Sequence, residues 1–235
     1  MAKLDSHLFP ADPDYLLLDI GPGDGEHAET FAQDRRVVAV EIDEALARTV
    51  ARRRSPWQLT SCRGDAHQLP IRLESVDGAV IIEVLEHVED PDEILAETFR
   101  VLKPSGSLCV AVPTSYTETV YSRLHPRYLS NATHVRVFKK DELCRRIEEQ
   151  GFVVSHVITE NLEPAIAWLV HALLRSDADP TGRVLEHTGI DRVVRRAIRR
   201  LEKTRGFGRS VSLARRHLGK SWYVFASKPP AGDAG

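Results

Sequence analysis

The stretch Leu16-Leu-Leu-Asp-Ile-Gly-Pro-Gly-Asp-Gly25 decides the fold. It is an apolar run that leads into three glycines at alternate positions, Gly21, Gly23 and Gly25. A buried strand followed by such a turn is typical of nucleotide-type sites, because glycine reaches positive φ and lets a ligand contact bare backbone. The spacing is G-x-G-x-G, and Glu26 stands where the dinucleotide pattern G-x-G-x-x-G requires glycine. The turn therefore disfavours NAD.

Apolar runs of strand length alternate with amphipathic helical stretches along most of the chain. This pattern predicts an α/β fold with a mostly parallel sheet that is covered on both faces. The chain has 235 residues, of which 42% are apolar, enough for one such domain with an insertion or a small cap. The expected strands are Tyr15–Ile20, Val37–Ile42, Trp57–Arg63, Val76–Ile82, Ser107–Val112, Phe152–Ile158 and Trp222–Ala226, and the expected helices are Glu26–Gln33, Glu44–Arg54, Asp92–Leu102 and Lys139–Gln150.

Two stretches interrupt the alternation of strands and helices. Residues 114–138 follow the fifth strand, and residues 161–220 are too many for an ordinary connection, so we expect them to form helices of their own. The predicted organisation is a core over residues 1–160 that includes a cleft segment at 114–138. A helical basic insertion follows at 161–220, then the last core strand at 221–228 and a tail at 229–235. We expect both interrupting stretches to form a lid over the carboxyl edge of the sheet.

Charge is distributed unevenly although the net charge is only −2. Residues 1–160 carry 18 Lys+Arg against 27 Asp+Glu, whereas residues 161–235 carry 14 against 7. The stretch Asp191–Leu201 shows helical periodicity with basic residues on one face. That face is either simply solvated or binds an anion, such as a nucleotide-linked or lipid-linked sugar diphosphate or an anionic membrane surface. Nucleic acid is disfavoured because few aromatic residues interleave with the basic ones.

The cysteines and the hydropathy pattern indicate a cytoplasmic protein. Cys62, Cys109 and Cys144 are far apart, odd in number and without a CxxC motif, which disfavours disulfides and structural zinc. No run of about 18 apolar residues is present, and the amino terminus is polar, so neither a membrane span nor a secretion signal is expected.

Acidic residues stand at or just after the ends of successive strands, where open α/β sheets bind their ligands. Asp19 precedes the glycine turn, Glu41 and Asp65 follow the second and third strands, and Glu83 and His87 follow the fourth. An acid about twenty residues past the turn can accept hydrogen bonds from ribose hydroxyls. Acids at several strand ends suit a cationic ligand with an amino group and a sulfonium, which indicates S-adenosylmethionine.

These residues belong to five motifs that occur in order at normal spacing. The chain thereby resembles the class I S-adenosylmethionine-dependent methyltransferases, in the small-molecule (type 11) subgroup similar to ubiquinone/menaquinone methyltransferases. The resemblance covers Tyr15 to about Ile158 and again Ser221–Lys228. The matching segments are Leu17-Leu-Asp-Ile-Gly-Pro-Gly-Asp-Gly25, Val38-Ala-Val-Glu-Ile-Asp43, Gly64-Asp-Ala-His-Gln-Leu-Pro70, Val84-Leu-Glu-His-Val-Glu-Asp-Pro91 and Val101-Leu-Lys-Pro-Ser-Gly106.

The resemblance implies a seven-stranded, mostly parallel Rossmann-like sheet in the order 3-2-1-4-5-7-6 with an antiparallel seventh strand. It also implies roles for the residues at the strand ends. The glycines would pass beneath the methionine part, Glu41 would hold the ribose, Asp65 and the Ala66 amide would bind adenine, and the backbone at Glu83 would meet the methionine amine. Asp19 and Ile42 complete the predicted cofactor-binding set.

Transfer of a methyl group to oxygen requires that a proton be removed, a task for which histidine is suited at neutral pH. His87 and His134 are therefore the candidate general bases, although His87 could equally border the cofactor pocket and His134 could be a surface or capping residue. Tyr116, Tyr121 and Tyr128 could line an acceptor pocket or form the lid's own small core, with Tyr116 and Tyr128 kept as candidate acceptor contacts. Arg136, on the same segment as His134, is a third candidate contact. No convincing ligand cluster indicates a metal.

The sequence thus predicts a methyltransferase for a small hydroxylated metabolite, which could be phosphate-bearing or lipid-linked. The segment 125–138 resembles methyltransferases of surface-polysaccharide and glycoside biosynthesis, so a sugar O-methyltransferase of a glycoside, antibiotic or polysaccharide pathway is expected. The alternatives are a cofactor-binding partner or scaffold subunit without activity, and an RNA methyltransferase that uses the basic helix. The sequence does not specify the acceptor, the methylated atom or the oligomeric state.

Overall fold

The computed structural model describes residues 9–53, 58–124, 134–160, 162, 166, 193, 194, 196–198, 200 and 219–232. The chain divides into two compact units. The core unit takes in residues 3–111, 141–156 and 224–235, and the second unit takes in residues 112–140 and 157–223, each as far as it is described. The described residues do not include Trp57, the segment 125–133 with Tyr128, or most of the predicted insertion at 161–220.

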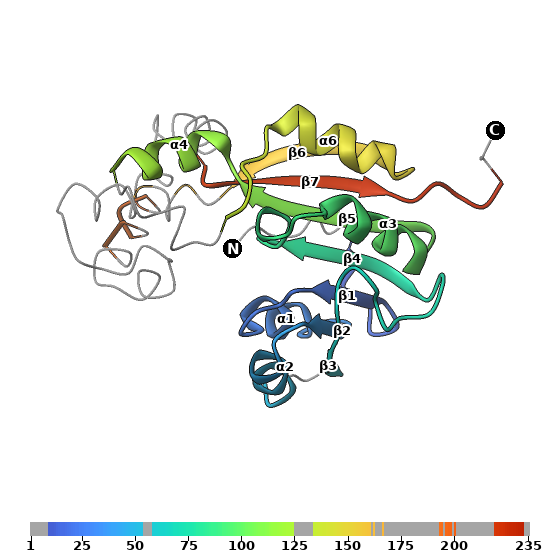
Figure 1. Cartoon of the computed structure of the whole chain (residues 1–235). Helices are drawn as coiled ribbons and strands as arrows, with labels where there is room; N and C mark the ends of the chain where they lie inside the picture. The colour runs from blue at the N-terminus through green and yellow to red at the C-terminus, as the bar shows by residue number, and fades with distance from the viewer. Residues whose placement is uncertain are drawn as a thin grey trace. The chain divides into compact units, whose positions relative to one another are not determined.

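A seven-stranded sheet organises the fold, in the order β3-β2-β1-β4-β5-β7-β6 (Figure 1). Strands β1 to β5 pair in parallel: β1 with β2 and with β4, β2 with β3, and β4 with β5. The strands are β1 Leu16–Ile20, β2 Arg36–Glu41, β3 Leu59–Arg63, β4 Val76–Ile82, β5 Leu102–Pro113, β6 Val153–Glu160 and β7 Ser221–Ser227. The helices are α1 Glu26–Phe31, α2 Glu44–Ala51, η1 Leu85–His87, α3 Pro91–Val101, α4 Ser115–Leu124 and α6 Lys140–Glu149.

The last strand, β7, is antiparallel to its neighbour β5, as both its hydrogen bonds and Figure 1 show. The amide of Ser105 donates to the carbonyl of Lys228 at 3.1 Å, and the amide of Lys228 donates to the carbonyl of Gly106 at 2.9 Å. At the other end of β5, the amide of Thr114 donates to the carbonyl of Lys220 at 2.8 Å. Residue numbers therefore rise along β5 while they fall along β7. The predicted strand order and antiparallel seventh strand are confirmed.

The centre of the sheet is buried as its apolar sequence predicted. In β1, Leu17, Leu18 and Ile20 have no exposed surface, and the middle of β4 and of β5 is buried to the same degree. Helix α2 begins at Asp43, whose carboxylate accepts from the amide of Leu46 at 2.9 Å and caps the first turn. Burial on both faces is what a parallel sheet with crossover helices requires.

The observed fifth strand, β5, begins earlier than the sequence pattern predicts. The sequence predicts it over Ser107–Val112, after a helix over Asp92–Leu102, whereas in the structure α3 ends at Val101 and β5 begins at once with Leu102. The abrupt change is stabilised by Lys228, whose Nζ donates to the carbonyl of Leu102 at 2.9 Å. A contact between residues 126 positions apart cannot be predicted from local propensity, which is why the sequence pattern missed it.

Candidate functional site

The carboxyl ends of the parallel strands lie at one edge of the core unit, which follows from the register of β1 with β2 and β4 and of β2 with β3. The predicted cofactor-binding residues occupy this edge. Asp19 and the glycine turn come from the end of β1, Glu41 and Ile42 from the end of β2, Asp65 and Ala66 from the loop after β3, and Glu83 from the end of β4. The structure therefore brings together the residues that the motifs singled out along some 65 positions of the chain.

The glycine turn needs glycine for two different reasons. Gly21, Gly23 and Gly25 all have positive φ, at 66°, 59° and 83°. A Cβ on Gly21 would lie 2.6 Å from a methyl group of Val84, and one on Gly25 would lie 2.7 Å from a methyl group of Val50. At Gly23 a Cβ would meet nothing within 4 Å. The outer two glycines are thus required for packing as well as conformation, whereas the middle one lies against open space.

Glu41 holds this turn in place from the end of the neighbouring strand. Its side chain is buried, with Oε2 accepting from the amide of Gly23 and Oε1 from the amide of Asp43, both at 3.0 Å. The amide of Gly21 donates in turn to the carbonyl of Val40 at 2.9 Å. Each carboxylate oxygen has two lone pairs, so these bonds leave Glu41 able to accept further donors such as ribose hydroxyls.

Asp19 is the least satisfied polar group at the edge. It is 2% exposed, and its Oδ2 has no hydrogen-bond partner among the residues that the structure describes. Burial first, and then the charge of Glu41, raise the pKa of Asp19 to about 7. A buried polar atom without a partner is costly unless a ligand satisfies it. Together with the charge of Glu41, it supports a cationic or hydrogen-bond-donating ligand, and an S-adenosylmethionine amine fits this requirement.

The loop after β3 presents Asp65 towards solvent. Its Oδ1 accepts from the amide of His67 at 2.9 Å and lies 2.8 Å from His67 Nδ1. These bonds hold the pKa of Asp65 below its ordinary value. Ala66 next to it is half-buried, while Ile42, just past Glu41, leaves 63% of its surface exposed. An exposed apolar side chain and an ionised carboxylate at neighbouring strand ends can contact the face and the amino group of a purine.

The end of β4 carries local backbone strain. Glu83 has φ at 53°, a conformation that residues other than glycine rarely adopt, and its amide donates to the carbonyl of Ala111 at 2.8 Å. The strained turn places Val84 against Gly21. His87 follows in the short helix η1, where its side chain is exposed and its amide donates to the carbonyl of Val84 at 3.0 Å. Glu83 thus turns the chain directly beside the glycine turn.

In the second unit, His134 pairs with an acid that the sequence reasoning missed. Its Nδ1 lies 3.0 Å from Oε2 of Glu118 on α4, and the two side chains are 8% and 2% exposed. The amide of Glu118 donates to the carbonyl of Thr114 at 3.0 Å, and the Thr114 hydroxyl accepts from the amide of Thr117 at 3.1 Å, which caps the helix. The pair joins residues 16 positions apart, and no local pattern links them.

The remaining predicted acceptor contacts differ in their setting. Tyr116 is 57% exposed, and the Arg136 guanidinium lies 5.8 Å from the centre of the Phe138 ring. Tyr128 lies outside the described residues. Tyr121, one turn after Glu118 on α4, is buried instead, and its burial together with the charge of Glu118 raises its pKa. Within the second unit, the Glu118–His134 pair and Tyr121 are thus buried, whereas Tyr116 is exposed.

Comparisons with known proteins agree with this geometry. Residues 18–110 match the family model described as a methyltransferase domain. A Mycolicibacterium smegmatis protein named as a probable S-adenosylmethionine-dependent methyltransferase is 34% identical over 144 residues, which cover 60% of this chain and 53% of that protein. The demethylmenaquinone methyltransferase of Renibacterium salmoninarum is 34% identical over 123 residues, which cover 52% of this chain and 51% of that protein. The chain spans about half the length of these relatives.

A solved structure of geranyl diphosphate methyltransferase in complex with GPP and sinefungin is similar in fold, with a TM-score of 0.64 and 18% identity. The match covers 95% of this chain and 75% of that one. Within the described ranges, no helix combines the length and the apolar character needed to cross a membrane.

Proposed function

The chain belongs to the S-adenosylmethionine-dependent methyltransferases, as the resemblance of its sequence predicted, and on this premise we propose that it methylates a hydroxyl group of a small metabolite. We further propose that the acceptor is a sugar of a glycoside, antibiotic or polysaccharide pathway. The sugar is supported by the likeness of segment 125–138 to methyltransferases of such pathways. The three cysteines are free thiols, which supports a reducing cytoplasm as the compartment.

The carboxyl edge of the core unit supports the cofactor assignment residue by residue. Glu41 would accept from the ribose hydroxyls, Asp65 and the Ala66 amide would bind the adenine edge, and Ile42 would cover its face. Asp19 and the bare backbone of Gly23 would lie against the methionine part, and the backbone at Glu83 would meet its amine. When bound, S-adenosylmethionine supplies a methyl group on a sulfonium that is already a strong electrophile, so the protein mainly aligns the acceptor and excludes water.

The observation that carries an oxygen acceptor is the buried pair of Glu118 and His134. A proton on Nδ1 that is donated to Glu118 would leave Nε2 of His134 as the ring nitrogen that takes a proton. Nε2 of His134 would take the proton of the acceptor hydroxyl as the oxygen bonds to the methyl carbon, and the bound cofactor would supply that methyl group from its sulfonium. The products are a methyl ether and S-adenosylhomocysteine, and the Glu118 carboxylate stabilises the imidazolium.

His87 is the second candidate base, and Tyr116, Tyr128 and Arg136 are the candidate acceptor contacts. Arg136 would suit an acceptor that carries phosphate, because a guanidinium binds phosphate in a bidentate manner. A nucleotide-linked or lipid-linked sugar is therefore the form of acceptor that we propose.

Labelled methyl transfer from S-adenosylmethionine tests the function, with a panel of nucleotide-linked sugars and with demethylmenaquinone as acceptors. We expect transfer to a sugar and a turnover about 10²-fold lower for His134→Ala, with S-adenosylhomocysteine binding unchanged by calorimetry. Absence of cofactor binding would refute the function as a whole. Binding without transfer to any acceptor would indicate a non-catalytic subunit, and preferential transfer to demethylmenaquinone would contradict the sugar. Unchanged turnover in both His134→Ala and His87→Ala would exclude a histidine base.

A further inference from the structure

The loop at residues 64–72, which follows β3, has little regular structure to hold it. Its own backbone contributes one isolated bridge between Asp65 and Gln68, with the amide of Gln68 donating to the carbonyl of Asp65 at 3.1 Å. The amide of Gly64 donates to the carbonyl of Glu41 at 3.0 Å, which fixes the loop where it leaves β3. At its other end the loop is held by side chains from elsewhere, and just beyond residue 72 the amides of Glu74 and Ser75 donate to the carbonyls of Arg100 and Val101 at 3.1 and 2.9 Å.

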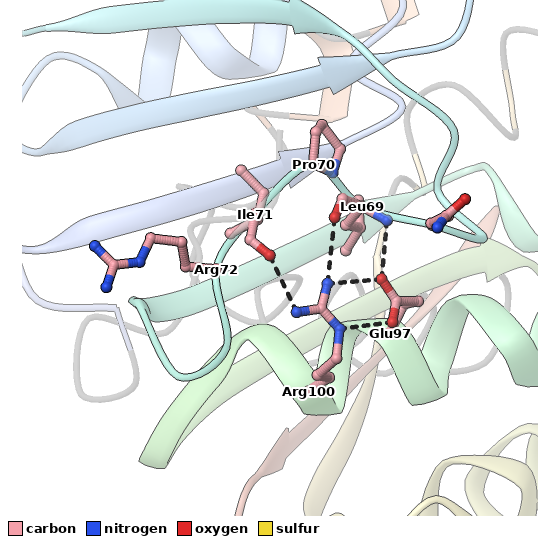
Figure 2. A pocket seen from close by; sticks show the side chains of 7 residues that line it. Leu69, Pro70, Ile71, Arg72, Glu97 and Arg100 are labelled. Atoms are coloured by element: carbon pink, nitrogen blue, oxygen red, sulfur yellow. Dashed lines mark hydrogen bonds and ion pairs between the residues drawn. The ribbon is translucent and has the colours of Figure 1, made fainter.

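Two residues of α3, Glu97 and Arg100, hold that other end (Figure 2). Oε2 of Glu97 accepts from the amide of Leu69 at 2.9 Å. Arg100 donates from Nη2 to the carbonyl of Leu69 at 3.2 Å and from Nη1 to the carbonyl of Ile71 at 3.1 Å. Three backbone polar groups of an irregular loop are thereby satisfied by two side chains one helical turn apart. The pair lines a hollow of about 460 Å³, together with residues 68–72.

The two side chains also fix each other. Nε and Nη2 of Arg100 donate to the two oxygens of Glu97 at 2.7 and 2.8 Å, the bidentate geometry that gives arginine–carboxylate pairs their directional specificity. This pairing, followed by the bond from Leu69, lowers the pKa of Glu97, and the same pairing raises that of Arg100. Their side chains are 19% and 35% exposed, so simple charge attraction contributes little to stability. What the pair supplies is a defined position for the loop backbone.

The two arms of the loop, which begin at the two points where it is held, also pack against each other. A Cβ on Gly64 would lie 2.8 Å from a methyl group of Val40 and 2.9 Å from Cδ of Pro70, so the arms of the loop are in close contact. Leu69 is buried, at 3% exposed. The turn that carries Asp65 and Ala66 lies between these arms. We therefore expect a change at the held end to shift the turn, although neither Glu97 nor Arg100 makes a hydrogen bond or ion pair with Asp65.

We propose that Glu97 and Arg100 are positioning residues for recognition of the adenine base. They hold the loop so that the Asp65 carboxylate and the Ala66 amide meet the adenine edge. This proposal rests on the proposed cofactor role of Asp65. It assigns a determinant of cofactor specificity to two side chains of α3 that bond to the backbone of the loop.

The test compares two ligands that differ at one position of the base, S-adenosylhomocysteine and S-inosylhomocysteine, in which a carbonyl oxygen replaces the amino group. The native protein should prefer the adenine compound by about 10-fold or more, because a carboxylate accepts from an amino group and repels a carbonyl. In Arg100→Met we expect the adenine compound to bind about 10-fold more weakly and the preference to fall towards unity. Calorimetry measures both affinities, and circular dichroism checks the fold.

Arg146→Met is the matched control. Arg146 pairs with Asp92 of the same helix α3 at 2.7 Å, but none of its recorded bonds reaches the loop, so both affinities and their ratio should stay at the native values. If Arg100→Met does not fold, Glu97→Gln removes the charge at constant shape and should reduce the preference by about 3-fold. Equal weakening of both ligands, or no change in either, overturns the proposal. A native protein that binds neither ligand refutes the cofactor assignment and this proposal with it.

Discussion

In the core unit, the polar side chains at the amino ends of the parallel strands differ in hydrogen bonding from Asp19 at the carboxyl ends. At the amino ends, the Asp77 carboxylate accepts from the amide of Leu16 at 2.9 Å and from Nζ of Lys103 at 2.6 Å. Nearby, Nζ of Lys228 donates to the carbonyls of Phe99 and Leu102 and to the Glu74 carboxylate at 2.9 to 3.1 Å. At the carboxyl ends, Asp19 keeps a buried oxygen without a partner in the described structure.

The difference indicates which end of the sheet is built for stability and which for binding. Paired groups at the amino ends join strands, helix and tail, and lower the free energy of the folded state. At the carboxyl ends, an unsatisfied carboxylate and a strained Glu83 are retained although each has an energetic cost, and the position at Gly23 stays open. Such costs are expected where a ligand will compensate them. Substitutions at the amino ends should therefore reduce stability, and those at the carboxyl ends should mainly change ligand binding.

Lys228→Met should lower the free energy of unfolding by about 3–5 kcal/mol, because it leaves two carbonyls and a carboxylate without their donor. The Nζ atom also lies 4.6 Å from the centre of the Phe99 ring, a favourable contact that methionine keeps only in part. Denaturant unfolding measures the loss. Lys139→Met, at an exposed lysine, is the control and should change stability little. Equal stability of the two variants would contradict the structural role of Lys228.

Asp19→Asn should make the protein without ligand more stable by roughly 2–4 kcal/mol above pH 7. The folded pKa of Asp19 lies near 7 and the unfolded value near 3.8, so the folded state holds its proton longer. Stability of the native protein therefore falls as pH rises from about 4 to 7, and the variant lacks this fall. Unfolding curves at several pH values measure it. A pH-independent difference between the two proteins would argue against a raised pKa.

Glu41→Ala and Asp65→Ala should each weaken binding of S-adenosylhomocysteine by about 1–3 kcal/mol, through loss of a partner for a polar ligand group. Glu41→Ala should have the larger effect, because Glu41 also holds the amide of Gly23. Calorimetry measures both affinities. Asp77→Ala is the comparison at the amino ends, where we expect a loss of stability with little change in affinity. The reverse ranking of Glu41 and Asp65 would show that the glycine turn does not depend on Glu41.

Gly23→Ala should have the smallest effect on the protein without ligand, a loss of about 1 kcal/mol from the positive φ, since no atom lies within 4 Å of the new Cβ. Gly21→Ala should cost more, because its Cβ would overlap Val84. Cofactor binding should nonetheless weaken in Gly23→Ala, because the new methyl group fills the open space at this position of the turn. Thermal unfolding and calorimetry separate the two effects, and unchanged affinity would mean that the cofactor does not pass over Gly23.

Most of the fold could be predicted from regular local patterns in the sequence. The apolar runs predicted all seven strands, with ends shifted by a few residues, and the strand order came from the family resemblance. The exception was the start of β5, which depends on Lys228 from the far end of the chain. The predicted organisation into a core and a basic insertion stays a prediction, since most of residues 161–220 lie outside the described structure.

For the candidate site, the sequence was sufficient to locate the glycines and the acids, because each follows directly from a strand end. The states of those acids depend on tertiary structure: the raised pKa of Asp19 requires both its burial and the charge of Glu41. Two further contacts also depend on tertiary structure. One is the pairing of His134 with Glu118, and the other is the set of bonds by which Glu97 and Arg100 hold the loop at residues 64–72. Spacing along the chain specifies which groups are available, whereas burial and neighbours distant in sequence decide their charge and orientation.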